Sequence, residues 1–391
     1  MKILSLFDGM ACGMIAMLNA GIEVERYDAY EIDPYPIKAS SHNFPNIHHH
    51  GDVFQADFAQ YEGVDFLIGG SPCTYWSIAQ KNNRETEASG MGWELFSQYV
   101  RAVKEAKPKF FIYENNKSMS AAIRESIDRA FGFDAVCINS ALVSAQNRQR
   151  LYWVGARNED GTYHKVPVEQ PEDRDILLND VLDNAIAWQD KSHAYTTRCQ
   201  GAVIEDTLAK HRHTMVAEPI NMTSNGKSQC LRATYYKDTD RNFIGNNFDL
   251  KTAVAEPCKV GSVRNRGIGP DAELYAIPIE FDGEKPVKAI SYTDGKEHHV
   301  YEVNNGQVTF KGKQYPVKLP DGYYIFRKLT VAECKRLQTV PDWYDFSVIS
   351  NSQAYKCLGN GWTCDVITHL INATQTAARR KWLKDLLGNC V

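Results

Sequence analysis

The chain has few of the features that mark metal-bound, disulfide-linked or membrane proteins. Its ten cysteines include no Cys-x-x-Cys pair and no His/Cys cluster at zinc spacing, which argues against a zinc site and a disulfide scaffold. The consecutive histidines His48 to His50 lie on a short link and do not converge easily on a metal. The apolar start, Met1 to Phe7, is too short to span or target a membrane. We therefore expect reduced thiols in a cytoplasmic protein, with no metal and no membrane contact.

An excess of one charge is also missing. The 391 residues hold 44 Lys+Arg and 48 Asp+Glu, a net charge of −4, and 43% of them are hydrophobic. This composition excludes a disordered or fibrous chain and gives no global reason to expect an anionic partner. Residues 191–268 differ, because they contain 12 Lys+Arg and 7 Asp+Glu. A surface that binds nucleic acid would therefore have to be local.

Short apolar runs alternate with helical patterns over the first 157 residues. This alternation is typical of β-α units and a mostly parallel, Rossmann-like sheet in an α/β protein. The pattern predicts helices over 14–19 and 35–42, and strands over 3–7, 26–32, 51–53, 66–69, 110–113, 136–143 and 151–154.

The composition and the hydrophobic pattern of the chain change after residue 159. Residues 160–185 are rich in Pro, Asp and Glu and look like a connector, and residues 190–325 contain short β-like runs. Turn pairs typical of hairpins separate these runs, namely Asn225-Gly226, Asp282-Gly283, Asp294-Gly295 and Asn305-Gly306. Helical patterning returns over 330–337 and 364–387. We predict one domain from residues 1–180 and 326–391, with a smaller β-rich domain, 185–325, inserted in it.

Glycines and acids follow the predicted strand ends. Phe7-Asp8-Gly9 follows the first strand, Glu31 ends the second, and Asp52 ends the third. A glycine turn lets a ligand approach the backbone, and an acid about 20 residues later can bind a ribose. The spacing is not Gly-x-Gly-x-x-Gly, so pyrophosphate is not favoured. The pattern predicts a nucleoside cofactor without phosphates, such as S-adenosylmethionine.

Reactive residue types follow the later strands. Cys73 comes after the apolar run 66–69 and Gly-Gly-Ser-Pro, and Glu114 comes after 110–113. Arg148 and Arg150 alternate on an extended segment, so they project to one face. Alone, the cysteine is more often a buried thiol and the acid a salt-bridge partner. Together, the residues match a nucleophile, a proton donor and an electrophilic clamp.

With these residues the sequence resembles the C5-cytosine DNA methyltransferases, most closely the phage-type bacterial enzymes and the animal de novo enzymes. The resemblance covers roughly residues 1–157 and 326–375, in the family's order. One position departs from the pattern, because Asn116 stands where Val is usual after Glu-Asn. The motifs that carry the resemblance are Phe7-Asp-Gly, Glu31, Gly51-Asp-Val, Gly70-Ser-Pro-Cys73, Glu114-Asn115, Gln146-Asn-Arg-Gln-Arg150, Arg327-Lys-Leu-Thr330, Pro341 and Gly359-Asn-Gly-Trp362.

The resemblance implies a mechanism and a partner. Cys73 would add to C6 of cytosine, Glu114 would protonate N3, Arg148 would bind the O2 side and Arg150 would support the loop. The base must leave the stack of double-stranded DNA to be reached. An RNA cytosine methyltransferase and a non-catalytic DNA-binding relative are the alternatives. The intact Cys73, Glu114 and Arg148 argue against the second, and the size of the inserted domain argues against the first.

The resemblance also assigns binding residues, and we expect a monomer. Residues 74–96 would form a loop over DNA, with phosphate contacts from Ser77 and Arg84. The inserted domain would recognise the target through Arg198, Arg232, Tyr235, Lys237, Arg241, Arg264 and Arg266. The expected contacts to S-adenosylmethionine are Phe7, Asp8, Gly9, Met10, Cys12, Glu31, Ile32, Asp52, Val53, Pro72, Leu95, Asn360, Gly361 and Trp362.

Overall fold

The computed structural model describes residues 1–78, 84–194, 203–210, 213–220, 279–282, 285–291 and 293–388. The chain divides into two compact units. The first contains residues 1–176 and the chain from 334 onward, and the second contains residues 177–193 and the described residues up to 333. The sequence places the boundaries of the inserted domain at residues 185 and 325, and that division stays a prediction. That the second unit recognises a target sequence stays a prediction.

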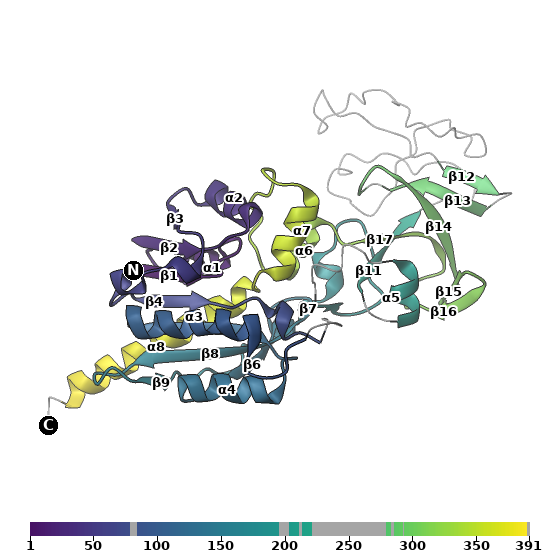
Figure 1. The fold of residues 1–391 in the computed structure, drawn as a ribbon. Coiled ribbons are helices and arrows are strands. Elements are labelled where there is room, and N and C mark those ends of the chain that lie inside the picture. Colours follow the sequence, from purple (N-terminus) through teal and green to yellow (C-terminus); the bar gives the residue numbers. More distant parts are fainter. Residues whose placement is uncertain are drawn as a thin grey trace. The chain divides into compact units, whose positions relative to one another are not determined.

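A mostly parallel sheet forms the centre of the first unit (Figure 1). Its strand order is β3-β2-β1-β4-β5-β8-β6, with β9 on the outer side of β8. The pairs from β3 to β5 are parallel, and β8 runs antiparallel to β5, β6 and β9. The predicted α/β fold is therefore confirmed. The strands are β1 (Lys2–Leu6), β2 (Arg26–Tyr30), β3 (Ile47–His49), β4 (Phe66–Gly69), β5 (Phe110–Asn116), β6 (Val136–Asn139), β8 (Gln149–Arg157) and β9 (Tyr163–Lys165).

Apolar side chains alternate between the two faces of this sheet, as the period of a strand requires. One face packs against α3 (Gly90–Ala106) and α4 (Ala121–Phe131), and the other against α1 (Cys12–Asn19) and α8 (Cys364–Gly388). The first face carries Leu4, Leu6, Leu67, Phe111, Tyr113, Leu151 and Trp153. The second face carries Ile3, Phe66, Ile68, Ile112, Tyr152 and Val154.

Several elements differ from the predicted ranges, and three of these differences bear on the site. The prediction of a third strand over 51–53 was wrong, because β3 covers Ile47–His49 and the Asp52 carboxylate accepts from the N–H of Phe54 to begin a 3-10 turn. The strand β5 continues to Asn116, which pairs with Arg150 of β8. β6 ends at Asn139, whose side chain starts another 3-10 turn. Asp52 therefore follows its strand at a distance, and Glu114 lies within a strand rather than beyond one.

Three further helices are α2 (Pro34–Asn43) and α7 (Asn351–Asn360), which belong to the first unit, and α6 (Val331–Leu337), within which the division between the units falls. The sequence reading included α2 and α6 within a few residues and missed α7. This helix begins at Ser350, whose Oγ accepts from the N–H of Gln353, the usual N-cap of a serine. It ends just before Gly361, so the motif Gly359-Asn-Gly-Trp362 lies at the sheet edge described below.

The second unit contains an antiparallel sheet, as the short runs and turn pairs predicted. Its strand order is β11-β17-β14-β13-β12, with β15 on β14 and β16 on β15. Asn305 and Gly306 both have positive φ angles, 51° and 67°, and form the two-residue turn between β14 and β15. The strands are β11 (Met215–Ile220), β12 (Ile279–Asp282), β13 (Lys285–Ile290), β14 (Glu297–Asn304), β15 (Gln307–Phe310), β16 (Lys313–Pro316) and β17 (Gly322–Lys328), and α5 (Ile204–Lys210) packs beside them through Leu208.

A buried arginine joins the elements of the second unit. The Arg327 guanidinium at the end of β17 donates to both carboxylate oxygens of Glu333, each at 2.9 Å. Its Nε lies 3.3 Å from Glu218 on β11. All three side chains are at most 5% exposed, so the guanidinium compensates buried negative charge on both carboxylates.

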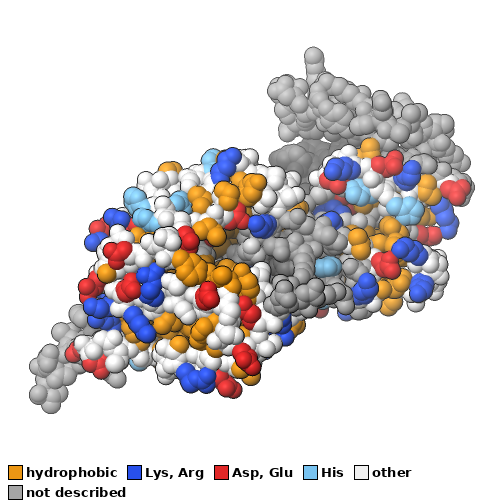
Figure 2. Space-filling view, viewed as in Figure 1, with side chains coloured by type: hydrophobic (Ala, Val, Ile, Leu, Met, Phe, Trp, Pro, Cys, Tyr) orange, Lys and Arg blue, Asp and Glu red, His pale blue; other side chains and the backbone are white. Residues whose placement is uncertain are grey.

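The surface carries charges of both signs. Figure 2 shows Lys and Arg side chains interspersed with Asp and Glu over the visible face of the first unit, without a wide field of one sign. Among the described residues, no helix is long and apolar enough to cross a membrane.

Candidate active site

A pocket of ≈ 210 Å³ opens at the carboxyl-terminal edge of the first unit's sheet, and we call it the edge pocket. Strands β1, β2, β4 and β5 end beside it, where open α/β sheets bind their ligands. Fourteen of the residues proposed from the sequence line it, namely Phe7, Asp8, Gly9, Met10, Cys12, Glu31, Pro72, Cys73, Glu114, Arg148, Arg150, Asn360, Gly361 and Trp362.

Cys73 enters the edge pocket from a tight connection after β4. Gly70 passes so close to β5 that a Cβ there would lie 2.8 Å from both the carbonyl oxygen and Oε2 of Glu114. Ser71 then bonds the Tyr113 hydroxyl at 2.7 Å, and Cys73 begins a 3-10 turn that ends at Tyr75. The Gly-Ser-Pro run therefore brings a partly exposed thiol next to the strand that carries Glu114.

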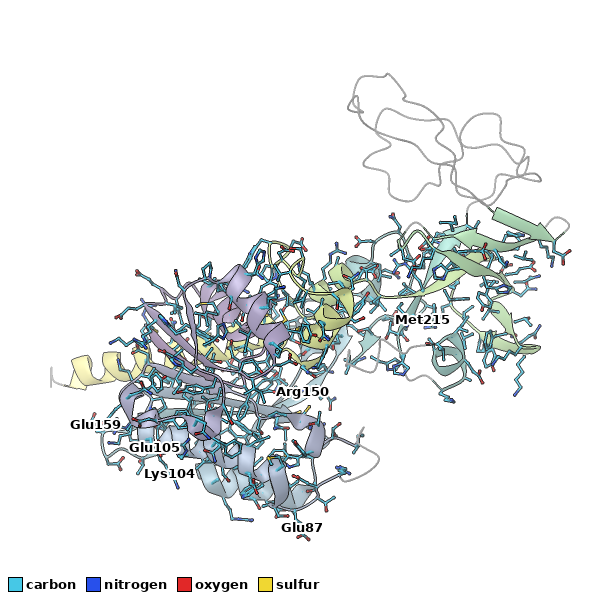
Figure 3. The ribbon with its side chains drawn as sticks, turned by 45° about the horizontal axis from the view of Figure 1, so that its top comes forward. Glu87, Lys104, Glu105, Arg150, Glu159 and Met215 are labelled. Carbon is cyan, nitrogen blue, oxygen red and sulfur yellow. The ribbon has the colours of Figure 1, made fainter. Side chains whose placement is uncertain are left out.

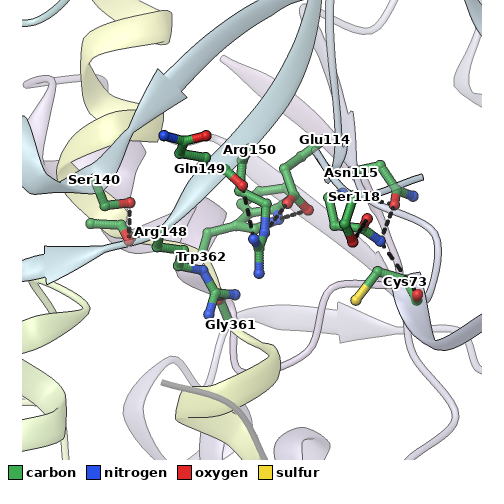
Figure 4. A network of polar contacts seen from close by, with 12 residues as sticks. Cys73, Glu114, Asn115, Ser118, Ser140, Arg148, Gln149, Arg150, Gly361 and Trp362 are labelled. Carbon is green, nitrogen blue, oxygen red and sulfur yellow. Dashed lines mark hydrogen bonds and ion pairs between the residues drawn. The ribbon is translucent and has the colours of Figure 1, made fainter. Parts of the chain in front are cut away.

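Glu114 is held from two sides inside the pocket. Its Oε1 lies 3.0 Å from Nε of Arg150, and its Oε2 accepts from the indole N–H of Trp362 at 3.0 Å. The three side chains come from β5, β8 and the segment after α7, and Figure 4 shows them together with Cys73. The carboxylate is only 12% exposed, so its direction is fixed before any ligand enters.

The two arginines have different partners, although both line the pocket. Arg148 donates to the carbonyl of Gly359 at 3.3 Å and to that of Gly361 at 2.9 Å. Its burial, and next the nearby charge of Arg150, lower the pKa of this guanidinium to about 10. Arg150 pairs with Glu114 instead and donates from Nη1 to the carbonyl of Gln149. Figure 3 shows Arg150 among the converging strands, whereas Glu87, Lys104 and Glu159 lie at the periphery of the same unit.

The glycine turn after β1 forms the other end of the pocket. The N–H of Gly9 donates to Glu31 Oε2 at 2.9 Å, so the acid at the end of β2 holds the turn. Asp8 Oδ1 accepts from Ser5 and from the Tyr27 hydroxyl, each at 2.6 Å, while its Oδ2 is buried without a partner. Burial raises the pKa of the Asp8 carboxyl to about 6.

Some proposed residues do not line the edge pocket. Ile32 is 73% exposed beside Glu31. Asp52 and Val53 form a turn after β3, and Leu95 packs against the core from α3. Ser77 lies next to the turn of Cys73, and Arg84 binds backbone carbonyls of the same region. Arg198, Arg232, Tyr235, Lys237, Arg241, Arg264 and Arg266 fall outside the described residues.

The sequence reading missed a charged pair at the mouth of the pocket. Asp33 Oδ2 lies 2.6 Å from Lys356 Nζ, and both residues line the pocket, as Cys357 does. The hydrogen bond to Asp33 raises the pKa of Lys356. Asp33 before Pro34 is a sequence pattern typical of a helix N-cap. No local pattern in the sequence connects Asp33 to Lys356. Within the described residues, no group of three or more His, Cys, Asp or Glu side chains could hold a metal ion.

Comparison with known proteins identifies the family of this chain. The family model described as "C-5 cytosine-specific DNA methylase" matches residues 1–376. The orphan methyltransferase M.SPRI of Bacillus phage SPR is 25% identical, over 94% of this chain and 95% of its own length. The type II methyltransferase M.FnuDI of Fusobacterium nucleatum is 23% identical, over 94% and 92%. The solved methyltransferase EhMeth of Entamoeba histolytica has a TM-score of 0.50 at 13% identity, with 95% and 97% covered, and shares the fold.

The chain therefore belongs to the C-5 cytosine-specific DNA methylase family. The resemblance seen in the sequence is confirmed, and so is the class of enzyme. Membership of the family does not by itself assign the roles of single residues, the cofactor or the nucleic acid.

Proposed function

We propose that this chain transfers a methyl group from S-adenosylmethionine to C5 of a cytosine in double-stranded DNA. The observation that carries the proposal is the edge pocket, because Cys73, Glu114 and Arg150 share it with the glycine turn at Gly9 and with Glu31. A nucleophile, a proton donor and a cation are thus within reach of one bound base.

The residues of the pocket fit this cofactor. Gly9, with a φ of 60°, exposes the backbone at the turn, and Glu31 stands beside it as in nucleoside sites. The buried, unpartnered Oδ2 of Asp8 is an acceptor that lacks a donor, and the cofactor carries an ammonium group. Phe7 and Trp362 would line the remaining walls. When bound, S-adenosylmethionine supplies an electrophilic methyl group.

Cytosine C5 is too weak a nucleophile to accept that methyl group unaided, so the protein must activate the ring. The Cys73 thiolate would add to C6, and the electron pair of the C5–C6 double bond would move toward C5 and N3. Glu114 would donate a proton to N3 and stabilise this electron-rich ring. After methylation, loss of the C5 proton and cleavage of the C6–sulfur bond would restore the double bond and release Cys73.

The contacts of the two arginines favour one of them for the cytosine carbonyl. Arg148 already donates from both terminal nitrogens to backbone carbonyls. Arg150 points its Nε at Glu114, the group that would hold N3, and O2 is the neighbouring atom of the ring. We therefore assign O2 to Arg150, and Arg148 to holding the Gly359–Gly361 segment in place. This differs from the roles expected from the sequence, in which Arg148 binds the O2 side and Arg150 supports the loop.

The pocket implies that the target base leaves the duplex, since C6 is shielded by stacking inside DNA. Unstacking costs a few kcal/mol, which contacts elsewhere on the DNA must offset. We assign those contacts to the second unit, the inserted recognition domain of the proposal. We also propose that the chain acts as a monomer.

A mechanism-based trap tests the proposal. A 5-fluorocytosine ring has no C5 proton to lose after methylation, so the sulfur cannot leave and the enzyme stays attached. We expect the wild-type chain to form a stable adduct with fluorinated duplex of random sequence when S-adenosylmethionine is present. The Cys73→Ser variant should form none, and mass spectrometry of the digested adduct should place the base on Cys73.

Cys137→Ser is the matched control, because Cys137 is also a partly buried thiol of the first unit but lies on β6, outside the pocket. It should retain the adduct. Bisulfite sequencing of DNA from cells that express the chain would then give the recognised motif. A wild-type chain that binds DNA and cofactor but traps no fluorinated duplex would refute the mechanism, and trapping on RNA alone would refute the choice of DNA.

A further inference from the structure

Asn116, the residue that departs from the family pattern, makes contacts that a valine cannot. It ends β5, two residues beyond Glu114, and is only 4% exposed. Its Nδ2 donates to the carbonyl oxygen of Cys73 at 3.4 Å. Its Oδ1 accepts from the Ser118 hydroxyl at 2.8 Å. One amide therefore joins the backbone of the nucleophile to the strand of the proton donor.

Arg84 strengthens the same junction from the opposite side. Its Nε donates to the carbonyl of Trp76 at 3.1 Å, and its Nη2 to the carbonyl of Ser118 at 2.6 Å. The planar guanidinium thus bridges the turn after Cys73 and the loop after Asn116. Figure 4 shows Ser118 beside Cys73 and Asn115. A partly buried arginine that serves two carbonyls has fewer donors left for a phosphate.

Glu85 is a third residue that contacts the turn after Cys73. Its Oε2 accepts from the indole N–H of the fully buried Trp76 at 3.0 Å, and both oxygens lie 3.2 Å from the N–H of Gly92 in the first turn of α3. The N–H of Glu85 donates to the carbonyl of Tyr75 at 2.9 Å. The turn is therefore tied to α3 as well as to β5.

We infer that Asn116 and Arg84 are positioning residues that fix the backbone of Cys73 against the strand carrying Glu114, so that Arg84 acts inside the protein rather than on a DNA phosphate. The inference rests on the proposed function, because it assigns how the nucleophile of that reaction is aligned. It also replaces the role expected for Arg84 from its place in the loop 74–96.

Substitutions at Arg84 and Asn116 distinguish a phosphate contact of Arg84 from its bridge between two backbone carbonyls. Arg84→Lys keeps the positive charge, so a phosphate contact would survive, but one ammonium cannot reproduce the fork that spans two carbonyls. Arg84→Met removes both functions. Asn116→Val introduces the residue usual in the family and removes both amide contacts. Arg129→Met is the matched control, since Arg129 is an exposed arginine on α4 of the same unit.

Two measurements on the full chain report on positioning. The first is the rate of adduct formation with saturating fluorinated duplex, together with the KM for DNA. We expect all three test variants to lower the rate about tenfold, the effect of losing about 1.4 kcal/mol, while KM changes less than about twofold. The control should match the wild type.

The second measurement uses the free protein. The N–H groups of Trp76 and Ser77 donate to the carbonyl of Cys73 at 3.1 and 3.0 Å, so their hydrogen exchange reports on the turn. We expect exchange there to become about tenfold faster in the variants, with exchange in β8 unchanged. This readout needs neither DNA nor cofactor, so it remains valid if the chain traps no fluorinated base.

Two results would overturn the inference. In one, Arg84→Lys behaves as wild type and Arg84→Met raises the KM for DNA without changing the exchange of the turn, which is the behaviour of a phosphate contact. In the other, Asn116→Val leaves both the adduct rate and the exchange at wild-type values. Faster exchange throughout the first unit would also contradict a local role, since it would indicate global destabilisation.

Discussion

The burial of the Asp8 carboxyl, with one oxygen unpartnered, leads to a prediction about how the free energy of unfolding depends on pH. Asp8→Asn keeps an oxygen that can accept from Ser5 and Tyr27, as Oδ1 does in the wild type, but it removes the titrating proton. At neutral pH the folded wild-type chain carries a buried negative charge at position 8, and the variant has no charge at that position. The two chains should therefore respond differently to pH.

The size of the effect follows from the pKa of Asp8, which burial raises from 3.8 to about 6. A carboxyl with a raised pKa in the folded state binds its proton more tightly there than in the unfolded chain. Its ionisation therefore destabilises the fold progressively as pH rises from about 4 to about 6, and the loss levels off above that range. The total is about 3 kcal/mol at pH 7, of which about 2 kcal/mol is lost between about pH 4.5 and 7.

Urea unfolding of both full-length chains across that range measures the effect. The other titrating groups contribute equally to both chains, so the difference in unfolding free energy isolates Asp8. The variant should gain about 2 kcal/mol on the wild type as pH rises from about 4.5 to 7. Parallel curves for the two chains would refute the reasoning, because they would show that Asp8 titrates alike in both states.

Three further substitutions have definite expectations. Arg327→Met removes the buried cation that contacts both Glu218 and Glu333 and should destabilise the second unit by about 3–5 kcal/mol in thermal unfolding, and a chain that melts like the wild type would contradict this. Gly155→Ala would place a Cβ 2.2 Å from Cε1 of Phe111 and should cost about 1–3 kcal/mol in urea unfolding; unchanged stability would mean that the ring moves freely. Trp362→Phe removes the indole donor to Glu114 and should slow fluorocytosine trapping about tenfold at unchanged stability, whereas an unchanged rate would show that the Arg150 contact suffices.

Much of the edge pocket was predictable because its parts follow strand ends. The turn at Gly9, Glu31 and Cys73 follow the ends of β1, β2 and β4, and parallel strands bring such residues to one edge. Arg150, expected at the same edge, also lines the pocket. Because β8 runs antiparallel to β5, its first residues lie at the edge where β5 ends.

Roles that depend on distant partners were not predictable. Tertiary contacts decide that Arg150, and not Arg148, pairs with Glu114, and the spacing of the two arginines in the sequence does not indicate this. Arg84 lies in a polar loop that reads as a surface segment, and only the fold brings Ser118 next to it. Lys356 is 323 residues from Asp33 in the chain, so no local pattern links them.

The edge pocket draws its walls from residues before 151 and from residues after 355, with the whole inserted unit between them. A ribosome makes about 5–20 residues per second, so the two halves of the pocket are synthesised some 10–40 seconds apart. During that interval the nascent chain already contains the thiol, its glutamate and Arg150, but not Trp362. The growing chain therefore cannot form the complete edge pocket until Trp362 has been translated.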